Sequence, residues 1–226
     1  MLNITVSSAT ENGGADKPTQ DLLLLLSLLL LILLHPVLAE EHLTRLLLGA
    51  LTFAPLIVAT IRISHKKELL WPLVALICAA VISSVGAYTS GSRTLLVIQW
   101  AVLTAAFVLA VSGLFAYLQR AGAITAGHLY TAASNYLLLT LSFFALYMAI
   151  VAVHPDAFQK AGGNPTHPPA DLLYFSLVTL TTVGYGDVVP VRGTVRMIAG
   201  LEAATGVLYV AITVAQLVSG YTARRT

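Results

Sequence analysis

Residues 179–187 read Thr-Leu-Thr-Thr-Val-Gly-Tyr-Gly-Asp and lie between two long apolar runs. A backbone that strips water from a cation must point successive carbonyl oxygens to the same side, which neither a helix nor a strand does. Alternating left- and right-handed dihedrals achieve this, and glycine adopts a positive φ at little steric cost. Gly184 and Gly186 stand at alternate positions, as such a ribbon requires. The stretch therefore predicts a row of carbonyl oxygens that face one side.

Residues 174–187, which read Tyr-Phe-Ser-Leu-Val-Thr-Leu-Thr-Thr-Val-Gly-Tyr-Gly-Asp, resemble the pore loop of the potassium channel superfamily. The resemblance implies a selectivity filter that consists of Thr182, Val183, Gly184, Tyr185 and Gly186. Potassium ions would bind to the carbonyl oxygens of the first four residues and to the hydroxyl of the threonine. The side chains of Val183 and Tyr185 would point away from the ions and hold the diameter of the filter. For the short motif alone, a glycine turn between two apolar segments is the alternative.

The composition places the chain in a membrane. Hydrophobic residues make up 58% of the 226 residues and charged residues only 10%, and the mean hydropathy is +0.86. A soluble domain carries about 25% charged residues. The net charge of +2 gives no reason to expect a nucleic-acid partner. No cluster of His, Cys and carboxylate residues has metal-ligand spacing, so we expect neither an enzyme nor a cofactor, and permeant K⁺ is the expected ligand.

Long apolar runs predict six transmembrane helices, because each is close to the length that spans a bilayer. The runs are residues 22–39, 46–63, 69–88, 94–118, 130–153 and 197–218. We therefore predict an all-α membrane protein with six transmembrane helices, in which a re-entrant pore helix and the filter lie between helices five and six. A cleaved signal peptide is the alternative for the first run.

Three regions follow from this pattern. Residues 1–21 are polar and are predicted to form a mobile tail. Residues 22–128 would form a four-helix scaffold, and residues 129–226 would form the pore module, with outer helix, turret, pore helix, filter and inner helix. Most lysines and arginines lie in the loops that would share a side with both termini, so we expect both termini in the cytoplasm of a cell with the protein in its inner membrane.

The start of the pore helix is expected at an acidic residue. Residues 154–170 contain prolines and glycines that cannot continue a helix, and are expected to form an extracellular turret. Asp171 is predicted to be the N-cap of a pore helix over residues 172–181, with its carboxylate at the positive end of the helix dipole.

Aromatic and polar residues beside the filter have roles that the resemblance implies. Tyr174 and Phe175 occupy the positions where relatives carry a cuff of paired aromatic residues around the filter. The resemblance also implies a hydrogen bond from Tyr174 to Asp187, and one between Thr179 and Tyr185 of a neighbouring subunit. All of these residues would support the filter without contacting ions.

The last helix carries a glycine at the position of the gating hinge in the superfamily. Gly206 lies nineteen residues beyond Asp187, and close helix packing is an equally good explanation for it. A face of small residues below it is predicted to line the inner cavity, with Val214 or Val218 at its narrowest ring and plain helix packing as the alternative. These residues are Val207, Val210, Ala211, Val214, Ala215 and Val218.

Glu202 is the exceptional residue of this helix. A carboxylate near the middle of a membrane costs about 2.5–3.5 kcal/mol on insertion scales unless it finds partners. Residues 201–209 resemble the inner helix of small bacterial ion-channel proteins. We expect Glu202 to form a hydrogen bond with Ser176 or Thr179 behind the pore helix in a neutral or ionised form, and proton sensing is a hypothesis that its replacement by Gln would test.

The missing charges indicate the type of channel. A voltage sensor needs several arginines on its fourth span, and residues 94–118 contain none. One pore loop in each chain cannot surround an ion, so a homotetramer in the lipid bilayer is expected. We predict a potassium-selective channel without steep voltage gating. The alternatives are a less selective cation channel, and a transporter or non-conducting scaffold with a vestigial loop.

Overall fold

The computed structural model describes residues 18–38, 52–61, 67–119, 125–162 and 169–222 of the chain. The elements in this part are α1 (Pro18–Leu38), a helix over Thr52–Ile61, α3 (Lys67–Ser90), α4 (Arg93–Leu118), α5 (Ala126–Val153), β1 (Phe158–Lys160), α6 (Pro169–Leu180), β2 (Val188–Pro190) and α7 (Gly193–Thr222). The tail that was predicted over residues 1–21 lies almost wholly outside the described residues.

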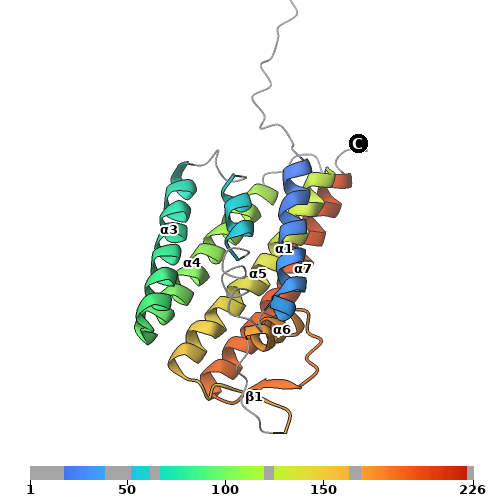
Figure 1. Cartoon of the computed structure of the whole chain (residues 1–226). Coiled ribbons are helices and arrows are strands. Elements are labelled where there is room, and N and C mark those ends of the chain that lie inside the picture. The colour runs from blue at the N-terminus through green and yellow to red at the C-terminus, as the bar shows by residue number, and fades with distance from the viewer. Residues whose placement is uncertain (1–17, 39–51, 62–66, 120–124, 163–168, 223–226) are drawn as a thin grey trace, which may run out of the picture.

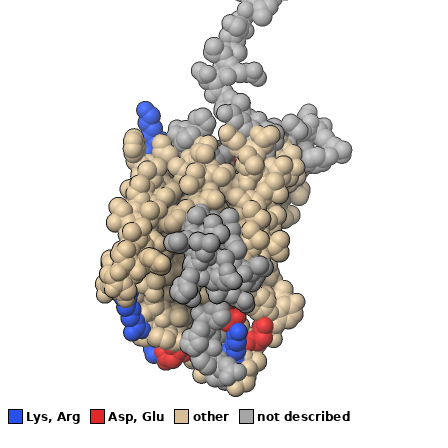
Figure 2. Space-filling view, in the orientation of Figure 1, with Lys and Arg blue, Asp and Glu red and all other residues tan. Residues whose placement is uncertain are grey.

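Within the described residues, four helices are long and apolar enough to cross a membrane: α3, α4, α5 and α7. Charged side chains gather at the two ends of the face shown in Figure 2, and the described surface between these ends is uncharged. The chain is therefore a multi-pass membrane protein. Helix α1 coincides with the first predicted span. The second predicted span, residues 46–63, is described only over Thr52–Ile61, so the number of six spans stays a prediction.

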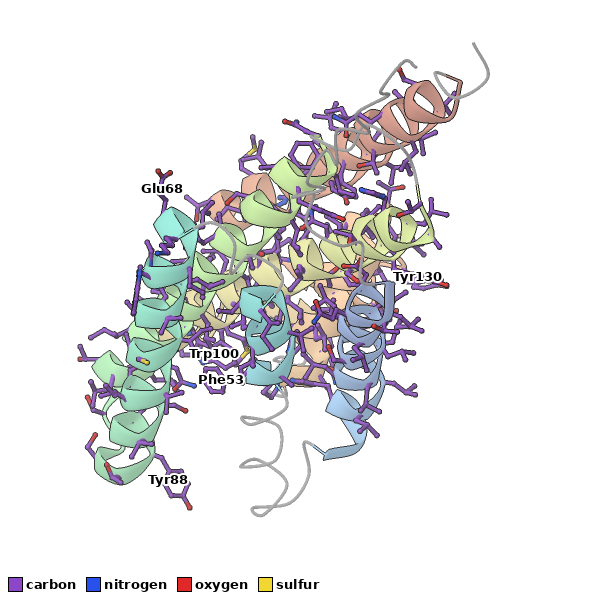
Figure 3. All side chains as sticks on the ribbon, turned by 90° about the horizontal axis from the view of Figure 1, so that it is seen from above. Phe53, Glu68, Tyr88, Trp100 and Tyr130 are labelled. Carbon is purple, nitrogen blue, oxygen red and sulfur yellow. The ribbon has the colours of Figure 1, made fainter. Side chains whose placement is uncertain are left out.

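Helix α5 lies at the centre of the bundle, where α1, α4, α6 and α7 all contact it. Helices α3 and α4 form a hairpin that reaches α5 through α4, so α3 lies at the edge (Figure 1). Figure 3 shows Glu68 and Tyr88 on α3, both pointing away from the other helices. Helix α1 packs along α5 through Leu24, Leu28 and Leu31, which are no more than 1% exposed. Helix α1 thus lies against the pore module, a partner that its leucine-rich sequence does not specify.

The helix directions place the described ends of the chain together. The start of α1 and the end of α7 lie at the same end of the molecule, while the β1–β2 ribbon lies at the opposite end with α6 near it (Figure 1). A chain that has both termini on one side of a membrane requires this arrangement.

A short antiparallel ribbon joins the segment after α5 to the segment after the filter stretch. Strand β1 pairs with β2 so that Phe158 lies opposite Pro190 and Lys160 opposite Val188. The backbone N–H of Ala161 donates a 2.7 Å hydrogen bond to the carbonyl of Asp187. Asp187 is the last residue of the stretch 179–187, so this hydrogen bond ties the end of that stretch to the segment after α5. The sequence analysis did not predict these strands, which are only three residues long.

Three buried aromatic rings join α5, β1 and α6. Tyr147, Phe158 and Phe175 contact one another edge to face, with ring centroids 5.1 to 5.3 Å apart. Edge-to-face pairs of this kind contribute about 0.5–1.5 kcal/mol beyond the area that they bury. The cluster therefore fixes the pore helix α6 to the outer helix α5 and to the ribbon.

Replacement of Phe158 by Ala removes the central part of this cluster. Phe158 is fully buried, so we expect Phe158→Ala to lower the free energy of unfolding by about 3–5 kcal/mol. The measurement is the melting temperature of the purified protein in detergent micelles. Tyr88→Ala is the control, because Tyr88 is 73% exposed and its loss should leave the melting temperature nearly unchanged. Equal melting temperatures for the two variants would contradict the role of the cluster.

Candidate functional site

The filter segment alternates between left- and right-handed backbone conformations. Thr182 has φ +59°, Gly184 has φ +52° and Gly186 has φ +77°, while Val183 and Tyr185 between them do not have a positive φ. This confirms the alternation that the spacing of the two glycines predicted. Thr182 is a third residue with a positive φ, and its residue type did not predict this conformation. A left-handed conformation costs a residue with a side chain about 1–2 kcal/mol, and strain of this size is typical of functional sites.

Backbone donors of the filter point toward the pore helix. The N–H of Thr182 donates to the carbonyl of Thr179 at 2.9 Å. The N–H groups of Val183 and Gly184 both donate to the carbonyl of Val178, at 2.9 and 3.1 Å. Carbonyls at the C-terminus of a helix have no partner within it, so the filter amides satisfy them. The filter is thus joined to the pore helix through its amide groups. The carbonyl groups of the filter take no part in these hydrogen bonds.

The glycines of the filter are required by conformation rather than by lack of space. A Cβ atom added to Gly184 or Gly186 would meet no atom within 4 Å in the single chain. Val183 is 52% exposed and Tyr185 is 73% exposed. The prediction that these two side chains pack behind the filter is therefore not fulfilled within one subunit, and it stays a prediction about contacts with a neighbour.

Tyr174 links the pore helix to two residues at the end of the filter stretch, Tyr185 and Asp187. Its ring stacks on that of Tyr185, with centroids 6.4 Å apart and planes within 3° of parallel. Its hydroxyl interacts with the carboxylate of Asp187, which accepts a 3.1 Å hydrogen bond from the N–H of Val188. The contact between Tyr174 and Asp187 that the resemblance implied is present within one chain.

Comparison with known proteins agrees with this geometry. Residues 135–222 match the model of a protein family described as "Ion channel". Three curated relatives are similar over part of the chain. Two pore potassium channel c of Oryza sativa subsp. japonica is 42% identical over 60 residues, which are 26% of this chain and 13% of that protein. Voltage-gated potassium channel KCNC1 of Mus musculus is 30% identical over 105 residues, 42% of this chain and 20% of that protein. Two-pore potassium channel 4 of Arabidopsis thaliana is 32% identical over 74 residues, 32% of this chain and 26% of that protein.

Residues 135–222 belong to this ion-channel family, and the similarity to these relatives supports the potassium channel superfamily. The family match begins within α5 and ends with α7, so it contains α6, residues 182–186 and α7, which are the predicted pore helix, filter and inner helix. The matched segments cover only about a quarter or less of the length of the curated relatives. No solved structure matches the chain significantly.

Phe175 does not form the cuff with Tyr174 that was predicted for this channel. Its ring contacts are with Tyr147 of α5 and Phe158 of β1, and it is 5% exposed. Successive residues of a helix point about 100° apart, and here Tyr174 stacks on Tyr185 whereas Phe175 turns to α5 and β1. The prediction for Phe175 is wrong because the side of α6 that it occupies packs against the outer helix.

Two ion pairs lie near the β1–β2 ribbon. Helix α6 begins at Pro169, so Asp171 lies in its first turn and is not the N-cap that was predicted. Its carboxylate is 2.8 Å from the Lys160 ammonium of β1, and a negative charge in a first turn still favours the helix dipole. Nη2 of Arg192 donates 2.9 Å hydrogen bonds to both carboxylate oxygens of Asp156 and lowers the pKa of this group.

The last carbonyl of the pore helix lies between the outer and inner helices. The Tyr136 hydroxyl of α5 donates a 3.0 Å hydrogen bond to the Leu180 carbonyl oxygen. On the other side is Gly206 of α7, where an added Cβ would lie only 2.0 Å from the same oxygen. Close packing therefore requires glycine at position 206. Its role as a gating hinge stays a prediction.

Glu202 lies one helical turn before Gly206 and is fully buried. Its Oε1 is 2.5 Å from the Ser176 hydroxyl oxygen of the pore helix, and its Oε2 is 2.6 Å from the Tyr147 hydroxyl oxygen. The predicted contact with Ser176 is present, and among the described residues Thr179 forms no hydrogen bond with Glu202. Tyr136 and Tyr147 were missed in the sequence, although they lie about three helical turns apart on one face of α5 and tyrosine hydroxyls inside a membrane need partners.

Helix α7 buries one narrow stripe in the single chain. Its members recur every three or four residues and face α5, α6 and the ribbon: Val195, Ala199, Glu202, Gly206, Tyr209 and Thr213. All of the predicted cavity residues are exposed: Val207, Val210, Ala211, Val214, Ala215 and Val218. Leu208 and Ile212 on other faces are exposed too, so exposure in one subunit does not separate a cavity from packing between subunits.

Replacement of Gly206 by Ala tests the close contact between α6 and α7. The added methyl group would overlap the Leu180 carbonyl, so we expect a clear loss of thermal stability and of the assembled form in detergent. The measurements are melting temperature and size-exclusion elution. Gly200→Ala on the same helix is the control, since its Cβ would meet no atom within 4 Å and alanine favours a helix by about 1 kcal/mol over glycine. If Gly206→Ala behaves like Gly200→Ala, the contact does not require glycine.

Proposed function

We propose that this protein is a homotetrameric channel that conducts K⁺ passively and selectively across a cell membrane. The observation that carries the proposal is the filter backbone, in which Thr182, Gly184 and Gly186 have a positive φ at alternate positions. Such a ribbon turns its carbonyls to one side, where they can replace the water around a potassium ion. The carbonyls of residues 182–185 and the hydroxyl of Thr182 are the proposed ligands.

Assembly as a tetramer follows from the one-sided ribbon. One chain offers carbonyl oxygens from a single direction, whereas a dehydrated ion needs oxygen atoms around it. The unburied side chains of Val183 and Tyr185 and the wide exposed face of α7 support the same proposal. Neighbouring subunits would cover them, with Thr179 contacting Tyr185 of the adjacent chain.

Helix α4 supports gating that does not depend steeply on voltage. Its only charged residue is Arg93, the first residue of the helix. The guanidinium of Arg93 donates hydrogen bonds to the carbonyls of Ala152 and Val153 at the end of α5. A cation that stabilises the end of a neighbouring helix is not a mobile gating charge, and moving one charge through 100 mV yields only about 2.3 kcal/mol.

The orientation belongs to the same proposal. The filter end, with the ribbon and the two ion pairs, would face the outside of the cell, and the start of α1 and the end of α7 would face the cytoplasm. The membrane would be the inner membrane of a bacterial cell.

Purified protein in liposomes tests the proposal through K⁺ flux. We expect wild-type protein to release K⁺ down its gradient and to pass Na⁺ far more slowly. Gly184→Ala should reduce K⁺ flux at least tenfold, because a left-handed alanine costs about 1–2 kcal/mol in each of four chains. Gly193→Ala is the matched control, since Gly193 lies at the start of α7 with open space around it and without a positive φ.

Each other outcome favours a different function. Equal flux of Na⁺ and K⁺ would indicate a less selective cation channel. An intact tetramer without flux would indicate a non-conducting scaffold, and normal flux through Gly184→Ala would show that the filter does not carry the ions.

Cysteine accessibility distinguishes a cavity from helix packing on α7. In a background with Cys78→Ala, we expect a membrane-impermeant thiol reagent to block K⁺ flux through Val214→Cys. The same reagent should leave Ile212→Cys unaffected, because Ile212 lies on the far side of α7. Val214 and Ile212 are similarly exposed in one subunit, 51% and 44%, so different reactivity would come from the assembly. Equal protection of both positions would favour packing over a cavity.

A further inference from the structure

A chain of four polar residues crosses the buried interface between the outer, pore and inner helices. It begins at Tyr147 of α5, whose hydroxyl oxygen is 2.6 Å from Glu202 Oε2. Oε1 of Glu202 on α7 is 2.5 Å from Ser176 Oγ on α6. Ser176 Oγ is also 2.9 Å from the carbonyl oxygen of Thr140, again on α5. All of these distances are hydrogen-bond distances between two oxygen atoms.

The number of available protons decides which groups donate and which accept in this series of four residues. Three oxygen–oxygen contacts each need one proton, while the two hydroxyl groups of Tyr147 and Ser176 supply only two. The carbonyl of Thr140 accepts and cannot donate. With an ionised Glu202, the single proton of Ser176 would have to serve two acceptors, and one contact would join two oxygens without a proton. The third proton has one remaining source, which is the carboxyl group of Glu202.

We propose that Glu202 is held as a neutral carboxylic acid that donates its proton to Ser176 and thereby positions the pore helix against the inner helix. Ser176 donates in turn to the Thr140 carbonyl, and Tyr147 donates to the other carboxyl oxygen. Every contact then has one proton, and every hydroxyl group has one acceptor.

The electrostatic surroundings require the same protonation. Glu202 is fully buried, and in the part of the chain that the structure describes no lysine, arginine or histidine forms an ion pair with it. The titratable side chains that interact electrostatically with Glu202 are Tyr136 and Tyr147, both on α5. Neither phenol supplies a positive charge, and burial of an unpaired carboxylate is strongly unfavourable.

The position of this acid explains what its proton does. Glu202 contacts Ser176, and one turn later Gly206 contacts Leu180, so the two helices touch at two successive levels in the same register. Leu180 is two residues before the first filter residue. The bond between Glu202 and Ser176 therefore fixes the height of the pore helix along the inner helix, and with it the height of the filter. Glu202 is a positioning residue, and its effect on conduction rests on the proposed function.

Infrared difference spectroscopy tests the protonation directly. For the full chain in liposomes, the spectrum of wild type minus Glu202→Gln should contain the C=O stretching band of a protonated carboxylic acid, shifted by deuterium exchange. Tyr147→Phe should move this band to higher frequency, because the carbonyl oxygen loses its hydrogen-bond donor. Glu68→Gln is the control, since Glu68 is exposed and its difference spectrum should contain carboxylate bands alone. Carboxylate bands for Glu202 would overturn the proposal, and an unshifted band in Tyr147→Phe would overturn the bonding order.

Flux measurements test the positioning role. Glutamine keeps one donor and one carbonyl in nearly the same shape, so Glu202→Gln should conduct K⁺ within about twofold of wild type, whereas Glu202→Ala should lose at least tenfold. A tenfold loss in both variants, with the tetramer intact, would show that the negative charge matters and would overturn the proposal. If wild-type protein conducts no K⁺, the proposed function fails, but the infrared bands still decide the state of Glu202.

Discussion

The carbonyl oxygen of Leu180 lies so close to Gly206 that no side chain fits between the pore helix and the inner helix. This contact fixes the last turn of α6, from which the filter continues two residues later. The hydroxyl of Tyr136 reaches the same carbonyl from the outer helix, so all three helices of the pore module meet at one backbone group. Because interiors are close-packed and do not deform smoothly, the position of the filter depends on this junction.

The filter itself is held from one side only. Its amide groups donate to the end of the pore helix, and Tyr174 holds its outer end through Tyr185 and Asp187. On the opposite side, toward which the carbonyls of an alternating ribbon turn, residues 181–187 are exposed in the part of the chain that the structure describes. A strained left-handed Thr182 is maintained under these conditions because the surrounding hydrogen bonds determine its conformation. In the proposed tetramer, one subunit would therefore supply one of the four ribbons that surround the ion.

The preceding helices contribute in two different ways. Helix α1 packs directly on α5 through a stripe of leucines, and Arg93 at the start of α4 stabilises the end of α5. In the described part of the chain, helix α3 packs against α4 rather than against the pore module. Leucine-rich helices that are apolar on all sides carry no directional signal, which is why their order around α5 could not be predicted.

The sequence alone determined the four membrane-length helices of the described residues and the alternating backbone of residues 182–186, because hydropathy and the missing side chain of glycine act within a short stretch of chain. It also predicted that Glu202 meets Ser176 or Thr179, since a buried carboxyl group needs a hydroxyl partner, and the contact with Ser176 is the one present. Only the tertiary structure decided that Phe175 turns away from the filter, that Asp171 pairs with Lys160 and that Tyr147 completes the contacts of Glu202. Each of these depends on which face of one helix meets which face of another, and that choice is made by packing between distant segments.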